Sequence, residues 1–346
     1  MTLEGKVALV CRHAAEVVTE DEVRALLARR GRPKAYVGFE PSGIMQIGQG
    51  FVIAAKIRDL VDAGFDVTVL LADWHAFIND KFGGDMQKIR ACGRYFEDCF
   101  RALGAPNSVR FRTATELVES SEYWLNVVRV SKTASVARIK RALTIMGRKE
   151  EEADLDASKL IYPAMQVGDI HALDLDLALG GIDQRHAHML YRDLAPKLGW
   201  KNVVALHTPL VGGLTGGGRM DPVESKMSKS TPDAAILLPE TASEVERKIG
   251  KAYCPPKEVD GNPVIDIARY IVLPRFGALK VERETRYGRD LVLRTFDELA
   301  AAYRSGDLHP KDLKDAVARQ LNDALEPVRA YFDAHPENYR ALFGGG

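Results

Sequence analysis

Residues 35–73, AYVGFEPSGIMQIGQGFVIAAKIRDLVDAGFDVTVLLAD, decide the fold of this 346-residue chain. The aromatic and β-branched run at 35–39 predicts a strand, and the turn-forming residues EPSG follow it. An apolar stretch over roughly 49–63 predicts a helix that ends at Gly64, and DVTVLLAD (66–73) predicts a strand buried on both faces. A strand, turn, helix and strand in this order form the βαβ unit of a parallel sheet, so we predict an α/β fold.

The pattern extends in both directions from this unit. Towards the N-terminus, Thr19 and Glu22 have the spacing of a capping box, which predicts the start of a helix. Towards the C-terminus we expect helices over 84–104, 124–149 and 158–173, a strand, turn and helix over 175–190, and a strand over 202–211. Helices with polar faces are expected beyond, over 242–252, 262–272, 295–304 and 310–332. This change of character places a domain boundary near 232–242.

Composition excludes several classes of protein. The chain has 48 Lys and Arg residues and 48 Asp and Glu residues, so its formal net charge is zero. This excludes a protein that binds nucleic acid through bulk positive charge. No apolar run reaches the roughly 18 residues of a membrane span, and the N-terminal sequence does not resemble a signal peptide. The four cysteines lack CxxC spacing, which favours reduced thiols over a disulfide framework or a zinc site. We therefore expect a cytoplasmic protein.

The strongest local motif is Lys226-Met227-Ser228-Lys229-Ser230, which follows the glycine-rich segment 212–218. Ammonium groups and hydroxyl donors on such a loop can close on a polyphosphate. Composition alone favours a simpler interpretation, a solvated basic loop. The pentapeptide nevertheless resembles the KMSKS signature of class I aminoacyl-tRNA synthetases, which makes the phosphate clamp the better interpretation.

From about residue 20 to 332 the chain resembles the tyrosyl-tRNA synthetases of the archaeal and eukaryotic type. The matching segments are YVGFEPSG (36–43), LLADWHAFIND (70–80), YPAMQVGDIHAL (162–173), GGIDQRHAHML (180–190), AYCPP (252–256), DGNP (260–263) and LHPKDLKDAVA (308–318). The resemblance implies an N-terminal helical segment (1–34), a Rossmann-like catalytic domain ending in the KMSKS loop (35–235) and an all-helical anticodon-binding domain (236–346). It also implies a homodimer.

The activity implied is that of a tyrosine–tRNA ligase. Tyrosine and ATP would form tyrosyl-adenylate, and the tyrosyl group would pass to the 3′ end of tRNA(Tyr). The implied partners are tyrosine, ATP and that tRNA, with Mg²⁺ accompanying the ATP and no resident metal, DNA or membrane.

The resemblance also assigns roles to individual residues. Tyr36 and Asp169 would hydrogen-bond the phenol oxygen of tyrosine, and Tyr162 and Gln166 lie four residues apart, on one helix face with Asp169. The tyrosine-binding set is Tyr36, His75, Tyr162, Gln166, Asp169 and Gln184. The ATP-binding set is Gly38, Glu40, Gly48, Lys226, Met227, Ser228, Lys229 and Ser230, with Gln46, Gln49, Lys226 and Lys229 as catalytic residues. His75 could equally be a packed histidine, and the two-residue spacing of His186 and His188 argues against a metal site.

Residues 128–149 carry seven basic side chains and no acid, a stripe that can neutralise phosphates or simply be a solvated helix face. The resemblance places Arg141 and Arg185 near the acceptor end of the tRNA. It assigns anticodon recognition to Tyr287, His309 and Asp312, an aromatic ring with polar groups of the kind that reads single-stranded RNA.

One departure from the family pattern matters. The family's HIGH motif falls on Gln46-Ile47-Gly48-Gln49, so both histidines are replaced by neutral donors, while Gly48 retains close backbone approach at a helix N-terminus. The departure leaves two alternatives, a tRNA-independent tyrosine-adenylating paralogue and a non-catalytic RNA-binding relative. The C-terminal anticodon residues disfavour the first, and the intact KMSKS motif disfavours the second. A tryptophan-specific relative is disfavoured by Tyr36 and Asp169.

Overall fold

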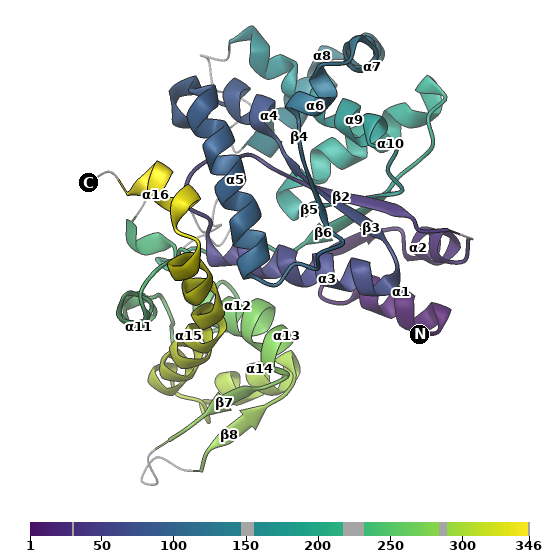
Figure 1. Cartoon of the computed structure of the whole chain (residues 1–346). Helices are drawn as coiled ribbons and strands as arrows, with labels where there is room; N and C mark the ends of the chain where they lie inside the picture. Colours follow the sequence, from purple (N-terminus) through teal and green to yellow (C-terminus); the bar gives the residue numbers. More distant parts are fainter. Residues whose placement is uncertain (30, 147–155, 217–231, 284–288, 345–346) are drawn as a thin grey trace.

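The structure, a computed structural model, describes residues 1–29, 31–146, 156–216, 232–283 and 289–344. A six-stranded sheet with the order β1-β6-β5-β2-β3-β4 forms its centre, flanked by helices on both faces (Figure 1). The strands β2 (Lys34–Phe39), β3 (Asp66–Leu71), β4 (Arg110–Thr113), β5 (Leu177–Gly181) and β6 (Val204–Thr208) run parallel. The predicted α/β fold is confirmed.

The βαβ unit that opened the sequence analysis lies at the middle of this sheet. Strand β2 pairs with β3 from Lys34↔Asp66 to Phe39↔Leu71, and α3 (Ile53–Ala63) connects them. This helix ends where Gly64 adopts a left-handed conformation with φ 103°, which glycine reaches without strain. Its first turn is a π-helix, η1 (Gly48–Val52). Because β2 pairs with β3 on one side and β5 on the other, the strand order reverses between β2 and β5, where ligands bind in such sheets.

Helices cover the sheet largely where the periodicity predicts them. They include α4 (Asp73–Ile78), α5 (Met86–Ala102), α6 (Thr115–Val118), α9 (Tyr162–Ala172) and α10 (Arg185–Leu198). The single helix predicted over 124–149 is wrong. The chain is extended at Ala134, so α7 (Ser121–Thr133) ends there and α8 (Val136–Ala142) begins anew. The Ser135 hydroxyl caps α8 by accepting from the backbone N–H of Arg138 at 3.2 Å, and this capping explains the break.

The N-terminal segment contains α1 (Leu3–Cys11), β1 (Glu16–Val18) and α2 (Glu20–Leu27). The capping box of α2 is confirmed, since Glu22 N–H donates to Thr19 Oγ1 at 3.2 Å and Thr19 N–H donates to the Glu22 carboxylate at 3.1 Å. Strand β1 was not predicted; it pairs antiparallel with β6 and closes one edge of the sheet. Three residues are too few to show a strand periodicity, and the pairing is made by tertiary contact.

The C-terminal part is mainly helical, with α11 (Ala242–Lys251), α12 (Pro263–Ile267), η7 (Ala268–Val272), α13 (Leu273–Phe276), α14 (Phe296–Ser305), α15 (Pro310–Ala334) and α16 (Glu337–Phe343). The prediction that it is all-helical needs correction, because β7 (Leu279–Val281) and β8 (Leu291–Leu293) form an antiparallel pair. These strands are again three residues long. Helix α16 returns to the sheet-bearing part and lies beside α5 (Figure 1).

An aromatic cluster joins α16 and the end of α15 to α5. The ring of Tyr95 on α5 lies 5.5 Å from Phe332, 5.8 Å from Tyr339 and 5.5 Å from Phe343, measured between centroids. The backbone N–H of Met45 donates to the Tyr95 hydroxyl oxygen at 3.4 Å. The last helix therefore packs against a residue that also contacts the segment leading into η1.

The described part of the chain contains neither a membrane-spanning helix nor a group of metal-ligating side chains. No helix there is long and apolar enough to cross a membrane. Within the same residues, no three or more His, Cys, Asp or Glu side chains are grouped so that they could hold a metal ion.

Asp266 on α12 reaches from the C-terminal part to the segment after β6. Its Oδ2 atom accepts from the backbone N–H of Gly212 at 3.4 Å. Burial raises the pKa of Asp266 to about 6, because the carboxylate loses more solvation than this contact returns. The folded state thus binds a proton between about pH 4 and pH 6 that the unfolded chain releases, and stability falls as the pH rises through this window.

We predict that Asp266→Asn, which cannot ionise, raises the free energy of unfolding by about 1–3 kcal/mol at pH 7.5 and changes it little at pH 4. Urea unfolding at both pH values measures the difference. Asp323→Asn is the matched control, because Asp323 is exposed on α15 and is not among the charges that shift the pKa of Asp266. An equal effect of Asp266→Asn at both pH values would contradict the assignment.

Candidate active site

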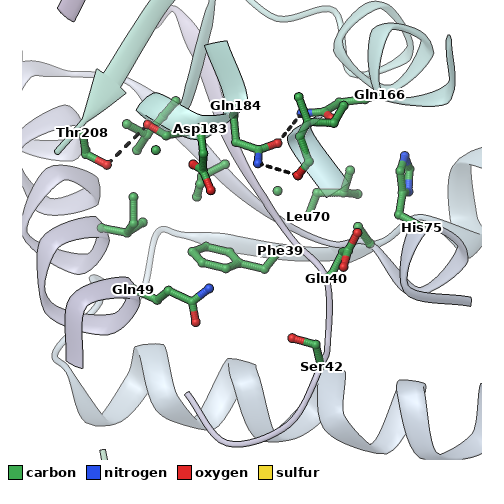
Figure 2. A pocket seen from close by; sticks show the side chains of 18 of the residues that line it. Phe39, Glu40, Ser42, Gln49, Leu70, His75, Gln166, Asp183, Gln184 and Thr208 are labelled. Carbon is green, nitrogen blue, oxygen red and sulfur yellow. Dashed lines mark hydrogen bonds between the residues drawn. The ribbon is translucent and has the colours of Figure 1, made fainter. Parts of the chain in front are cut away.

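A cavity of about 470 Å³ opens at the carboxyl ends of the parallel strands, on both sides of the reversal between β2 and β5. It gathers nearly all the predicted substrate-binding residues that the structure describes. Its lining includes Tyr36, Gly38, Glu40, Gln46, Gly48, Gln49, His75, Tyr162, Gln166, Asp169 and Gln184. Figure 2 shows Gln166 and Gln184 on one side of the cavity and Ser42 and Gln49 on the other.

One end of the cavity is built around the buried carboxylate of Asp169 on α9. The hydroxyl of Tyr123, on α7, donates to Asp169 Oδ1 at 2.8 Å. His75 Nε2 lies 3.1 Å from Oδ2 as an electrostatic pair without an aligned hydrogen bond. Burial opposes protonation of His75, but the Asp169 carboxylate outweighs it and raises the pKa of His75. The carboxylate is thus held in one orientation by two neighbouring elements.

Tyr36 on β2 faces this end of the cavity with a neutral phenol. Burial, together with the nearby Asp169 charge, raises the pKa of Tyr36. A phenol and a carboxylate side by side in an apolar surrounding form a pair that can donate to and accept from one ligand hydroxyl.

Two glutamines form the next row of the cavity wall. Gln166 Nε2 donates to Gln184 Oε1 at 3.2 Å, and Gln184 Nε2 donates to the carbonyl of Ile145 at 3.1 Å (Figure 2). Among the described residues, buried Gln166 Oε1 has no hydrogen-bond partner. A buried acceptor without a partner is costly, so this oxygen is suited to a ligand donor such as an ammonium group.

Glu40, directly after β2, adds a negative charge beside this row. Its two oxygens accept from Asn79 Nδ2 at 3.1 and 3.0 Å, the Tyr162 hydroxyl donates to it, and Lys81 Nζ lies 3.5 Å away. Burial, and then the Glu40 charge, raises the pKa of Tyr162, so this phenol also stays protonated. The cavity wall is therefore polar and negatively charged beside the glutamines.

The opposite side of the cavity is formed by the segment Gln46–Gln49 at the start of η1. Gln46 pairs with Leu237 in an isolated bridge, and Ile47 N–H donates to the carbonyl of Ile236 at 3.0 Å, so the segment is anchored to the chain that follows the KMSKS motif. A Cβ atom on Gly48 would lie 3.1 Å from Val211 Cβ. This close packing accounts for the glycine.

Other predicted residues lie outside the cavity. Arg141 is exposed on α8, and Arg185 at the start of α10 pairs with Glu16 at 2.8 Å. His309 caps α15 by accepting from Lys311 N–H at 3.2 Å, and Asp312 lies in the first turn of the same helix. The predicted residues Lys226, Met227, Ser228, Lys229, Ser230 and Tyr287 lie outside the described residues.

Sequence reasoning missed several residues of the site. Asp183, His188 and Thr208 line the cavity, and Tyr123 supports Asp169 from behind. The run Gly-Gly-Ile-Asp-Gln before α10 was a usable signal for Asp183. No local signal marks Tyr123 because its partner is 46 residues away in the sequence.

Residues 28–326 match the model of a protein family described as class I tRNA synthetases (W and Y). The chain belongs to this family. It is 48% identical over 348 residues to the tyrosine–tRNA ligase of Saccharolobus islandicus strain L.S.2.15, covering 97% of this chain and 96% of that protein. It is 50% identical over 344 residues to the tyrosine–tRNA ligase of Aeropyrum pernix, covering 96% and 94%.

Solved structures agree with this membership. A crystal structure of tyrosyl-tRNA synthetase from Aeropyrum pernix superposes with a TM-score of 0.89 at 47% identity, covering 99% of this chain and 98% of that one. A tyrosyl-tRNA synthetase from Pyrococcus horikoshii complexed with L-tyrosine superposes with a TM-score of 0.92 at 36% identity, covering 99% and 100%. The resemblance predicted from the motifs is confirmed.

Gly180, at the end of β5, lets this synthetase's cavity wall pack closely. A Cβ atom there would lie 2.9 Å from Gln184 Cβ and 3.1 Å from His188 Cε1, so Gln184 would have to move. We predict that Gly180→Ala lowers the free energy of unfolding by about 1–3 kcal/mol. Urea unfolding measures it. Gly38→Ala is the control, because its nearest contact would be an ordinary 3.5 Å to Tyr36; equal losses in both variants would refute the packing argument.

Proposed function

We propose that this chain is a tyrosine–tRNA ligase. The observation that carries the proposal is the buried Asp169 carboxylate beside Tyr36, a hydroxyl-binding pair at the end of a cavity in a class I tRNA synthetase. Relatives 48% and 50% identical over nearly the full chain are tyrosine–tRNA ligases. The enzyme joins tyrosine to ATP, giving tyrosyl-adenylate and pyrophosphate, and transfers the tyrosyl group to the 3′ end of tRNA(Tyr).

In the bound state, the tyrosine phenol lies between Tyr36 and Asp169. Its ammonium group lies at Gln166 Oε1, the acceptor without a partner, with Tyr162 and Gln184 beside it. Phenylalanine would fill the same space and leave the Asp169 and Tyr36 polar groups without their ligand partner, which is unfavourable in a buried site. Selectivity for tyrosine follows from that penalty.

The nucleotide occupies the side of the cavity formed by Gly38, Glu40 and Gly48. A carboxylate oxygen of tyrosine bonds to the α-phosphorus, and the bond from that phosphorus to the bridging oxygen of pyrophosphate breaks. No protein nucleophile is needed, so catalysis consists of positioning and of stabilising charge on the phosphoryl group. Gln46 and Gln49 donate as neutral amides, and Lys226 to Ser230 close on the pyrophosphate. Mg²⁺ enters with ATP as part of the substrate.

The proposed tRNA contacts follow from the position and charge of five residues. Arg141 and Arg185 serve the acceptor end, and Tyr287, His309 and Asp312 read the anticodon. The corresponding division assigns 1–34 to an N-terminal segment, 35–235 to catalysis and 236–346 to anticodon binding. We place the enzyme in the cytoplasm, consistent with four cysteines that form no disulfide.

An exposed apolar face supports the proposal of a homodimer. Leu125 and Val128 on α7 and Val136 on α8 are 51%, 53% and 66% exposed. Their spacing places the first two on one helix face, next to the start of α8. Apolar side chains clustered in this way suit contact with a second copy. The mass of the protein in solution, measured by light scattering against the 38.2 kDa of one chain, tests this.

Exchange of labelled pyrophosphate into ATP tests the function. We expect exchange with tyrosine and little with phenylalanine or tryptophan, followed by charging of tRNA(Tyr). Exchange without charging would favour the tRNA-independent paralogue, and no exchange with any amino acid would favour the non-catalytic relative.

The same assay tests the glutamines. Gln46 is buried and lines the cavity, so Gln46→Ala removes a donor and is expected to slow exchange by about tenfold or more with little change in the KM for ATP. Gln46→His, alone or with Gln49→His, is expected to raise the rate. An unchanged rate in Gln46→Ala would show that this side chain takes no part in the chemistry.

Asp169→Ala is expected to weaken tyrosine binding and to relax the rejection of phenylalanine. The ratio of kcat/KM for the two amino acids in the exchange assay measures the change. Asp59→Ala is the control, because Asp59 is also a buried carboxylate but pairs with Arg12 and Lys56 away from the cavity. The pocket assignment fails if the ratio for Asp169→Ala equals that of the control.

A further inference from the structure

Three side chains connect the edge strand β1 to the cavity wall. His207 on β6 places Nδ1 2.8 Å from Glu16 Oε2 on β1, and its Nε2 lies 3.0 Å from His188 Nδ1 on α10. The two imidazole rings lie edge to edge, with centroids 5.1 Å apart and planes 17° from parallel. His207 and His188 are almost fully buried, whereas the Glu16 side chain is 29% exposed. The contacts form one hydrogen-bonded chain from the edge of the sheet to His188.

The order of donors and acceptors in this chain is fixed by its first member. A carboxylate only accepts, so His207 Nδ1 carries the hydrogen. Burial lowers the pKa of His207 despite the Glu16 charge, so the ring is neutral and its Nε2 is an acceptor. His188 Nδ1 must therefore donate. Burial lowers the pKa of His188 to about 3, so this ring is neutral as well, and its Nε2 carries only a lone pair.

His188 lines the cavity, and its Nε2 has no hydrogen-bond partner among the described residues. Gly180 contributes to this arrangement, because a Cβ atom there would lie 3.1 Å from His188 Cε1 and would cover this edge of the ring. Asp183 and Thr208 line the same side of the cavity. This side of the cavity is formed by residues of β5 and β6 and of the chain after them, whereas Tyr36 of the phenol-binding pair lies on β2.

We propose that Glu16 and His207 are positioning residues that hold His188 as a hydrogen-bond acceptor for a ribose hydroxyl of the bound nucleotide. The inference rests on the proposed function, which puts ATP and then tyrosyl-adenylate in this cavity. Apart from the phenol, which lies at Asp169, the hydroxyl donors of these ligands are those of the ribose. An imidazole whose Nε2 carries only a lone pair accepts a hydrogen bond from such a hydroxyl. In the opposite tautomer Nε2 carries the hydrogen and could only donate to the hydroxyl oxygen.

Charged groups flank the contact between Glu16 and His207. Arg185 from the start of α10 pairs with Glu16 at 2.8 Å, and Asp183 lies in the preceding turn. Glu16 therefore accepts from two donors, Arg185 and His207. A pair of histidines with a purely structural role would stabilise the fold but would not make the enzyme sensitive to the hydroxyls of the nucleotide.

The experiment compares ATP with 2′-deoxyATP and 3′-deoxyATP in tyrosine-dependent pyrophosphate exchange. For wild type, we expect one deoxy analogue to lower kcat/KM by about tenfold through loss of one hydrogen bond. His188→Phe, which lacks the acceptor, should lower kcat/KM for ATP by a similar factor and no longer distinguish that analogue. His188→Gln, whose amide oxygen reaches the position of Nε2, should restore part of the discrimination.

Glu16→Gln tests the positioning role without disturbing the core. Its amide can donate to His207, so the fixed tautomer is lost, and we expect weaker discrimination and a shifted pH profile of kcat/KM. Glu22→Gln is the matched control: Glu22 lies in the same N-terminal segment and pairs with Arg192 at 2.8 Å, with no contact to the histidines. It should behave as wild type.

If His188→Phe distinguishes ATP from its deoxy analogues as wild type does, the proposal is overturned while the exchange activity of wild type stands. If that variant does not fold, unchanged discrimination in Glu16→Gln overturns the proposal instead. Absence of exchange in wild type would instead refute the proposed function. Calorimetric binding of adenosine, 2′-deoxyadenosine and 3′-deoxyadenosine to wild type and His188→Gln gives a readout independent of activity. Equal affinities of wild type for all three would also overturn the proposal.

Discussion

Parallel pairing between β2 and β5 is the constraint on which the rest of the site depends. These strands meet through Ala35↔Leu177, Tyr36↔Ala178 and Val37↔Leu179, although they are far apart in the sequence. Their shared direction brings the residues after both strands to one edge of the sheet. Glu40 follows β2, Gln184 follows β5, and the segment Gln46–Gln49 returns to the same edge. A single register thus sets the relative positions of these groups around the cavity.

Buried charge makes this edge rigid. Two carboxylates at the cavity are held by other elements: Asp169 accepts from Tyr123 and lies beside His75, and Glu40 accepts from Asn79 and Tyr162. Inside a protein such contacts are stronger than in water, and loss of any one would leave an unpaired group. The orientation of the ligand-binding groups is therefore fixed before a ligand arrives, which is the condition for selective recognition of a hydroxyl.

The sequence predicted the parts of this arrangement that depend on local pattern. The βαβ unit, the capping box at Thr19 and the helix that carries Gln166 and Asp169 follow from periodicity and end signals. Strands β1, β7 and β8 were missed because three residues show no period, and the break at Ser135 was missed because a capping serine inside a helical pattern is a weak signal. Tyr123, and the link from Glu16 to His188, depend on contacts between distant segments. Only the folded chain brings those residues together.

The return of α16 to α5 means that the boundary between the two parts of the chain is not a boundary of folding. Tyr95 contacts Tyr339 and Phe343 with its ring and Met45 with its hydroxyl, so the last helix supports the residue that precedes Gln46. Local opening of α16 would expose the Tyr95 ring and loosen the approach to η1. Exchange of the Met45 amide hydrogen with solvent should therefore respond to opening of α16.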